Sequence, residues 1–139
     1  MKIFFTGAIR GGRARQPNYA AIVKILRQYG TVLSEHVADE TISEYGETDV
    51  SKEKIHDREL EALAKSDAVV AEVTTPSLGV GYLIAHASRL EKKIIALYNG
   101  EDTLKLSAMI KGDAHVTVYA YETLDDLQKT LNSAFGQKI

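Results

Sequence analysis

The feature of this sequence that most constrains its fold is a regular alternation of short apolar runs and helix-like stretches. The apolar runs lie at 3–5, 31–37, 68–73, 93–98 and 116–121, and several are almost continuously apolar, as in strands buried on both faces. Helical patterns lie between and after them, at 18–29, 52–65, 79–91, 103–111 and 123–135. This alternation predicts a parallel sheet covered by helices on both faces. We therefore expect an α/β fold, Rossmann-like or flavodoxin-like, with a five-stranded parallel sheet in a single domain over residues 1–139.

The ends of the predicted elements show where a ligand would bind. Asn18 and Thr123 are expected N-caps, and Gly30 and Gly136 are expected to end helices. In open parallel sheets the loops after strands 1 and 3 usually flank the ligand crevice. Here those loops are GAIRGGRARQP, from residue 7, and TTPSLGVG, from residue 74. The polar stretch 37–51 is long for a connection within a domain, and we interpret it as a lid over the site rather than a disordered segment.

Composition and charge exclude several classes of function. A formal net charge of -2 gives no electrostatic footprint for nucleic acid or for an anionic membrane surface. No apolar run is long enough to span a membrane and no signal-peptide pattern is present, so we expect a cytoplasmic protein. The absence of cysteine excludes disulfides, a thiol nucleophile and Cys-bound zinc, and the four histidines show no HExxH-like spacing, so no metal site is predicted.

The first of the two loops is rich in glycine and arginine. Its pattern, Gly7-x-x-x-Gly11-Gly12, matches neither the dinucleotide fingerprint nor the P-loop, which argues against an NAD or ATP site. Its backbone N–H groups, with Arg10 and Arg13, can still bind an anion. A flexible solvated turn is the alternative interpretation of this loop.

The second loop favours the anion-binding interpretation. It carries Thr74, Thr75 and Ser77 from a strand into a helix, so hydroxyl and N–H groups meet the positive end of the helix dipole. Two such loops at adjacent strand ends predict one ligand that bears a phosphate.

Glu59 is a carboxylate in an apolar position. It lies four residues after Ile55 and four before Leu63, on the apolar stripe of the helix predicted at 52–65. One interpretation is a partly desolvated catalytic acid. The other is a residue at the edge of the stripe that reaches solvent or pairs with a cation such as Lys52. Periodicity does not decide between the two.

The histidines and tyrosines near the predicted site have different expected roles. His36 ends the second predicted strand, on the same sheet edge as the loops, and is a candidate ligand contact. His56 is more simply explained as a histidine on the helix surface. Tyr82 and Tyr98 are interpreted as core or rim aromatics, with no catalytic role.

Five segments, in order along residues 3–112, carry a family resemblance: FTGAIRGGR, YGTVLSEHVA, IHDREL, SDAVVAEVTTPSLGVGY and LSAMIKG. In them the chain resembles the 2′-deoxynucleoside 5′-phosphate N-hydrolases of the nucleoside 2-deoxyribosyltransferase superfamily. The resemblance implies a homodimeric glycosidase of nucleotide metabolism. Its substrates would be deoxynucleoside 5′-monophosphates and its products free base and deoxyribose 5-phosphate, with no metal or organic cofactor.

The same resemblance implies which residues surround the nucleotide. They are Gly7, Ala8, Ile9, Arg10, Gly11, Gly12, Tyr19, His36, Ser77 and Gly79, with Ser107, Ala108 and Met109 contributed by the neighbouring subunit. The first loop is then a phosphate cradle.

The chain departs from the family pattern at four positions. Leu83 stands where the family has its nucleophilic glutamate, and Glu59 stands where it has an aspartate. Phe4 replaces a tyrosine of the first strand, and Ala8 replaces a loop serine. Without the nucleophile no covalent glycosyl intermediate can form. Leu83 also fits the apolar stripe of its own helix, so core packing explains it as well.

Three hypotheses about function follow. The first is an N-glycoside hydrolase of nucleoside 5′-monophosphates with altered or impaired catalysis, in which Glu59 acts as general base on water or general acid on the departing base. The second is a nucleotide-binding protein with weak or no turnover. The third, a flavodoxin-like signalling module, ranks last because the first strand ends in Phe-Phe-Thr-Gly rather than in clustered acidic residues. The preferred base, and the choice between ribose and deoxyribose, stay open.

Overall fold

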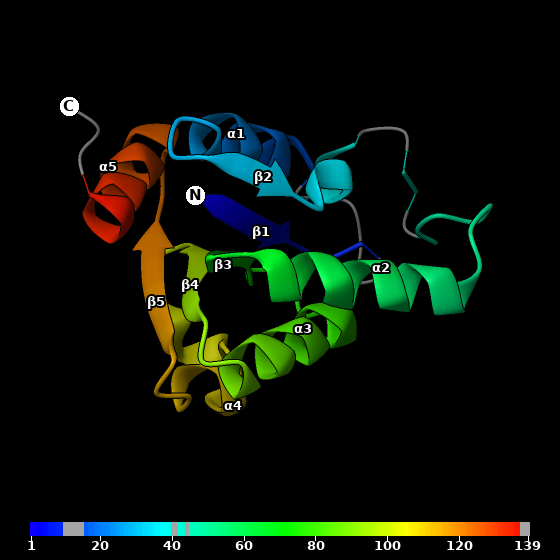
Figure 1. The fold of residues 1–139 in the computed structure, drawn as a ribbon. Helices are drawn as coiled ribbons and strands as arrows, with labels where there is room; N and C mark the ends of the chain where they lie inside the picture. The colour runs from blue at the N-terminus through cyan, green and yellow to red at the C-terminus, as the bar shows by residue number, and fades with distance from the viewer. Residues whose placement is uncertain (10–15, 40–41, 44, 137–139) are drawn as a thin grey trace.

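The computed structural model describes residues 1–9, 16–39, 42–43 and 45–136. Its centre is one parallel sheet in the order β2-β1-β3-β4-β5. The strands are β1 (Lys2–Thr6), β2 (Thr31–Leu33), β3 (Ala68–Glu72), β4 (Lys93–Asn99) and β5 (Val116–Tyr121) (Figure 1). The predicted α/β fold with five parallel strands is confirmed.

The strand order places the two predicted loops side by side. The chain runs outward from β1 to β2 and then crosses back to β3 on the other side of β1. β1 and β3 pair in parallel from Ile3↔Ala68 to Thr6↔Ala71, so both strands end at the same edge of the sheet. This is the reversal of strand order at which α/β sheets bind ligands.

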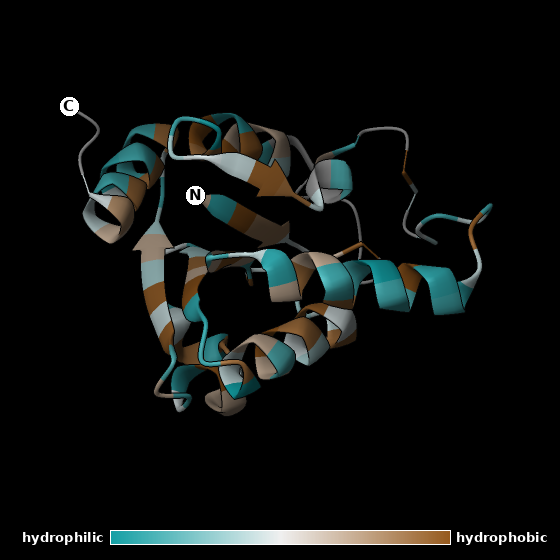
Figure 2. Cartoon of the chain, viewed as in Figure 1, coloured by the Kyte–Doolittle hydropathy of each residue, from teal (hydrophilic) through white to brown (hydrophobic). Residues whose placement is uncertain are grey.

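Helices cover both faces of the sheet (Figure 1). α1 (Gln16–Leu26) and α5 (Leu124–Phe135) pack on one face, and α2 (Lys52–Lys65), α3 (Leu78–Arg89) and α4 (Ala108–Lys111) on the other. Each face has its own buried apolar cluster, and the neighbours Phe4 and Phe5 point into different ones, as alternate residues of a strand do. Figure 2 shows α2 as largely hydrophilic with few hydrophobic bands, which fits a helix that meets the core along one stripe.

The second predicted strand is shorter than expected. It ends at Leu33 because Ser34 adopts a left-handed backbone with φ 58°, and the next residues form the 3₁₀ helix η1 (Glu35–Ala38). His36 therefore lies on η1 and not at the end of a strand. This bend could not be predicted from periodicity, because a non-glycine residue such as serine only rarely adopts a left-handed backbone.

The predicted helix 103–111 is also wrong, because the chain forms two separate pieces there. These are the 3₁₀ helix η2 (Thr103–Lys105) and α4. The Asp102 side chain caps η2, and the Ser107 side chain caps α4 by accepting from Met109 N. A side chain that caps the backbone starts a new element and interrupts a longer one.

The ends of α1 differ from expectation, whereas those of α2 and α5 do not. α1 begins at Gln16, so Asn18 lies inside its first turn and is not the N-cap, and it ends at Leu26 rather than at Gly30. α2 has the predicted bounds, Thr123 caps α5 and Gly136 follows it with φ 84°. Within the described part of the chain, no helix is long and apolar enough to cross a membrane.

Candidate functional site

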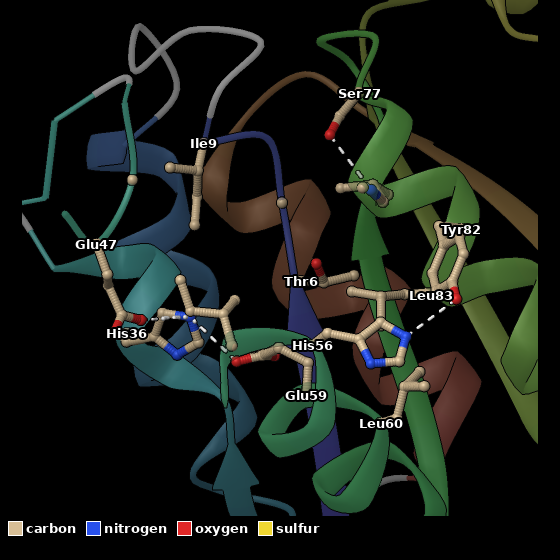
Figure 3. Close-up of a pocket in the computed structure, with 15 residues that line it drawn as sticks. Thr6, Ile9, His36, Glu47, His56, Glu59, Leu60, Ser77, Tyr82 and Leu83 are labelled. Carbon is tan, nitrogen blue, oxygen red and sulfur yellow. Dashed lines mark hydrogen bonds and ion pairs between the residues drawn. The ribbon is translucent and has the colours of Figure 1, made fainter. Parts of the chain in front are cut away.

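A cavity of about 250 Å³ opens beyond the carboxyl ends of β1 and β3, between α2, α3 and the segment that precedes α2 (Figure 3). It lies at the sheet edge that the sequence predicted. Its lining residues are Thr6, Gly7, Ile9, His36, Gly46, Glu47, Ile55, His56, Glu59, Leu60, Ser77, Gly79, Val80, Tyr82 and Leu83.

The loop after β1 is supported from below by Tyr19. This tyrosine is fully buried, and its hydroxyl accepts a 3.0 Å hydrogen bond from Ala8 N. A Cβ at Gly7 would lie 2.8 Å from the tyrosine ring, so the close approach requires glycine. Tyr19 and Ala8 thus lie under the cavity wall, while Gly7 and Ile9 line it. Arg10, Gly11, Gly12 and Arg13 lie outside the described residues.

The loop after β3 leads the chain into α3 at the cavity. The Ser77 side chain is the N-cap and accepts a 3.2 Å hydrogen bond from Val80 N. Ser77 and Gly79 line the cavity. The first N–H groups of a helix have no carbonyl acceptors within the helix, and its dipole is positive at that end. This wall therefore suits an anion.

Glu59 is the centre of a polar cluster at the inner end of the cavity. Its Oε2 accepts a 2.5 Å hydrogen bond from Ser34 Oγ. Its Oε1 accepts from Arg58 Nη2 at 3.1 Å and lies 3.3 Å from His36 Nε2. The Glu59 side chain is only 12% exposed. Of the two interpretations left open by the sequence, the pairing with a cation occurs, but the cation is Arg58 and not Lys52. The small exposed fraction of the side chain also fits a partly desolvated acid.

Glu47 joins the same cluster from the segment that the sequence marked as a lid. Its carboxylate accepts from Arg58 at 2.6 and 3.0 Å and lies 3.4 Å from His36 Nε2. The hydrogen bond from Arg58 lowers the pKa of Glu47, opposed by burial and reinforced by the nearby His36. The same hydrogen bond raises the pKa of Arg58. Sequence reasoning missed Ser34, Glu47 and Arg58, since no regular spacing connects them.

The opposite wall carries His56 and Tyr82. His56 Nε2 lies 3.1 Å from Tyr82 Oη, and His56 Nδ1 lies 2.9 Å from Asp57 Oδ1. Both ring systems line the cavity, and Figure 3 shows them facing each other across α2 and α3. The sequence suggested only a surface histidine and a rim aromatic at these positions. Their pairing depends on how the two helices pack.

Leu83 follows Tyr82 on α3 and forms part of the cavity wall. It packs against the apolar cluster under α3, which includes Val80, Ile84 and Ala87. The predicted core packing and a place in the cavity wall therefore occur together at this position. Phe4 is fully buried in the same cluster.

Two other carboxylates at the ends of strands, Glu72 and Asp67, do not line the cavity. Glu72 is fully buried at the end of β3, where it accepts hydrogen bonds from Tyr121 Oη and, at 2.7 Å, from Thr74 N. Asp67 accepts from Lys2 N at the opposite end of the sheet. Within the described residues, no group of three or more histidines and carboxylates is arranged to hold a metal ion.

The segment with Ser107 and Met109 lies apart from Glu59 within one chain. Both residues line a second cavity of about 780 Å³, which also contacts Tyr98, and Ala108 is exposed between them. Two of its apolar lining residues are largely exposed, Leu78 at 97% and Met109 at 82%. Leu104, which precedes the lining residue Lys105, is 83% exposed.

Comparisons with known proteins agree with this architecture. The model of the family described as nucleoside 2-deoxyribosyltransferase matches residues 3–133. The chain is 42% identical over 137 residues to 5-hydroxymethyl-dUMP N-hydrolase of Danio rerio, covering 97% of this chain and 96% of that protein. It is 49% identical over 113 residues to the Rattus norvegicus protein of the same name, covering 81% and 69%. Among solved structures, the Clostridium botulinum CMP N-glycosidase has a TM-score of 0.68 over 95% of this chain and 99% of its own, and at 17% identity this likeness concerns the fold alone.

Proposed function

The chain belongs to the nucleoside 2-deoxyribosyltransferase family, and from this premise we propose that it hydrolyses the N-glycosidic bond of nucleoside 5′-monophosphates. The products are the free base and ribose or deoxyribose 5-phosphate. The observation that carries the proposal is the cavity at the ends of β1 and β3, where the start of α3 and the carboxylate of Glu59 face one space.

The phosphate binds at the start of α3 in this proposal. Ser77 and Gly79 bring N–H groups and a helix dipole to the cavity, and Gly7 brings the adjacent backbone of the first loop. The sugar then lies further along the cavity, with its C1′ between Glu59 and Leu83.

Glu59 is the general base of the proposed reaction. Its two oxygens accept hydrogen bonds from Ser34 and Arg58, so the carboxylate has a fixed direction and is held as an acceptor. Leu83 supplies no nucleophile, so water itself attacks C1′ and gives its proton to Glu59. The route is a single displacement without a glycosyl-enzyme intermediate.

We extend the proposal to assembly and location. The exposed apolar residues Leu78 and Met109 line a large, mainly apolar cavity, and the exposed Leu104 precedes its lining residue Lys105. An apolar surface of this kind marks an interaction site. A second copy of the chain covers this surface, and its Ser107 to Met109 segment completes the nucleotide site from the partner side. The homodimer works in the cytoplasm.

One observation favours a second candidate function. Leu83 packs against the apolar cluster under α3, so its side chain contributes to the core and offers no nucleophile to the sugar. The chain would then bind nucleoside monophosphates with weak or no turnover.

The deciding experiment incubates the purified protein with each ribo- and deoxyribonucleoside 5′-monophosphate and assays the free base by chromatography, with Glu59→Gln as control. Calorimetry in parallel compares deoxyadenosine with its monophosphate. We expect the nucleoside to bind at least about tenfold more weakly, because charge-assisted hydrogen bonds contribute roughly 1.5–3 kcal/mol each. Tight binding without base release supports the binding protein. Equal affinity for nucleoside and monophosphate overturns the phosphate site.

A further inference from the structure

The cavity contains a second set of proton-transfer groups, in addition to the cluster around Glu59. Asp57, His56 and Tyr82 form a chain in which the carboxylate meets Nδ1 of the imidazole at 2.9 Å and the phenol meets Nε2 at 3.1 Å. The two contacts use different ring nitrogens. This is the order in which a carboxylate orients an imidazole and the imidazole exchanges a proton with a hydroxyl group.

N-glycoside hydrolysis needs two proton transfers of opposite sense. Water must lose a proton as it attacks C1′, and the departing base must gain one because a free nucleobase anion is a poor leaving group. Glu59 accepts hydrogen bonds from Ser34 and Arg58 and lies beside His36. In both of these hydrogen bonds the Glu59 carboxylate is the acceptor. The donor must therefore come from another part of the cavity.

His56 and Tyr82 are placed to supply that proton. His56 precedes Glu59 by three residues on α2, so one rigid helix presents both groups to the same cavity. Tyr82 reaches the cavity from α3, and Figure 3 shows Leu83 next to Tyr82 and close to His56. Tyr82 is half exposed, so the His56–Tyr82 pair can recover its proton from solvent. The Tyr82 ring also packs against the His86 ring, with 4.8 Å between the centroids.

A similar trio elsewhere on the surface shows why this geometry matters. Ser88 Oγ and Asp113 Oδ1 both approach the same nitrogen of His115, Nδ1, at 3.2 and 3.5 Å. A proton cannot pass through that ring from one partner to the other, and the trio lines neither described cavity. His115 is thus a matched control for His56.

We propose that Tyr82, with His56 behind it, is the general acid that protonates the departing nucleobase. As the C1′–N bond breaks, its electron pair stays on the base nitrogen, which takes the proton of Tyr82 Oη. The proton on His56 Nε2 moves to Tyr82 Oη, and Asp57 keeps the remaining Nδ1–H in place. Water adds to C1′ and gives a proton to Glu59, so one water molecule is consumed. This inference rests on the proposed function.

The test uses two substrates that differ only in the leaving group. One is a deoxynucleoside 5′-monophosphate that the parent protein cleaves, and the other is 4-nitrophenyl 2-deoxyribose 5-phosphate, whose leaving group departs as a stable anion and needs no proton. The variants are His56→Gln and Tyr82→Phe, with His115→Gln as control. We expect both variants to lose about 100-fold or more in kcat on the nucleotide, with little loss on the nitrophenyl substrate and little change in nucleotide affinity. Glu59→Gln should slow both substrates.

Each remaining outcome has a definite meaning. Equal losses on both substrates, or losses in His115→Gln as large as in His56→Gln, overturn this inference and leave the proposed function intact. A parent protein that cleaves the nitrophenyl substrate but no nucleotide has no working acid, which overturns this inference together with the proposed hydrolysis of nucleotides. A parent protein that binds nucleotides and cleaves neither substrate overturns the proposed function, and this inference with it.

Discussion

Arg58 holds Glu47 with two hydrogen bonds, of 2.6 and 3.0 Å, across 11 positions of the chain. The same Nη2 lies 3.1 Å from the carboxylate of Glu59. One guanidinium thus connects Glu47, in the segment before α2, to the carboxylate of Glu59 in the cavity. The positions of these two carboxylates are therefore coupled.

The contribution of Glu47 to stability should depend on pH. Its pKa lies below the ordinary value of 4.5, chiefly because Arg58 donates to it. A carboxyl with a lowered folded-state pKa stabilises the protein above its unfolded pKa, and that contribution disappears as the pH falls through the folded pKa. Arg58 is 43% exposed, so solvent screening limits the effect. We expect Glu47→Gln to cost about 0.5–1 kcal/mol at neutral pH and almost nothing well below pH 4.5.

Urea unfolding of the parent and of Glu47→Gln across this pH range checks the prediction. Glu53→Gln is a suitable control, because Glu53 is an exposed residue in the first turn of the same helix. A difference between parent and Glu47→Gln that stays constant at every pH would contradict the role of the Arg58 contact.

Restoring a carboxylate at position 83 should accelerate base release. Leu83→Glu places the group in the cavity near the positive end of α3, where a carboxylate is stabilised and available to attack C1′. The charge replaces part of an apolar cluster, so we expect a loss of roughly 1–3 kcal/mol in the free energy of unfolding. Recovery should be partial, because Phe4 and Ala8 remain and geometry limits the rate.

The measurement for position 83 is the rate of base release, with Leu83→Gln as a control of the same size without charge. A folded, nucleotide-binding Leu83→Glu protein that gains nothing over the glutamine variant would show that residue 83 does not face the sugar.

Gly7→Ala should destabilise the protein, and Gly79→Ala should not. A methyl at Gly7 would meet the buried Tyr19 ring at 2.8 Å, whereas at Gly79 the nearest atom is Ser77 Oγ at 3.9 Å. Overpacking of this kind costs about 1–3 kcal/mol, while alanine in a helix is better than glycine by roughly 0.5–1 kcal/mol. Thermal unfolding of the two variants separates them, and equal melting temperatures would refute the close packing of the first loop.

The proposed dimer should dissociate when a charge is placed at its centre. Met109 is 82% exposed beside the larger cavity, and Leu124, on α5, is 54% exposed. We expect light scattering to show a dimer for the parent and for Leu124→Glu, and a monomer for Met109→Glu, because a buried unpaired charge is strongly unfavourable. A parent protein that is monomeric at micromolar concentration would remove the partner's segment from the site.

Much of the fold could be predicted because it depends on local patterns. The apolar runs that became β1, β3 and β4 are largely buried strands, and the run that became β5 is a partly exposed strand at the sheet edge. The stripe around Leu63 marked α2 with its observed bounds. The two loops could be placed at one edge of the sheet from the sequence, because the alternation of strands and helices implies which strand ends they follow. Glu59 could be singled out because a carboxylate on an apolar stripe is unusual.

The missing parts depend on contacts between distant segments. Ser34 bends the chain at the end of β2 and directs its hydroxyl at Glu59, 25 positions away. Tyr82 meets His56 only because α2 and α3 pack side by side, across 26 positions. Propensity and periodicity describe neighbours in the chain, so neither contact leaves a signal in a single sequence.

The position of β1 in the sheet also determines when the site can form during synthesis. β1 pairs with β2 on one side and with β3 on the other, and β3 begins only at Ala68. Until the ribosome has delivered that strand, one edge of β1, whose centre is Ile-Phe-Phe, stays unpaired as an aggregation-prone strand edge. Gly7 and Ile9, which follow β1, are synthesised first, but the cavity that they line is complete only once α3 has been made. Ligand added to a translating ribosome could therefore stabilise only nascent chains long enough to include Arg89, the last residue of that helix.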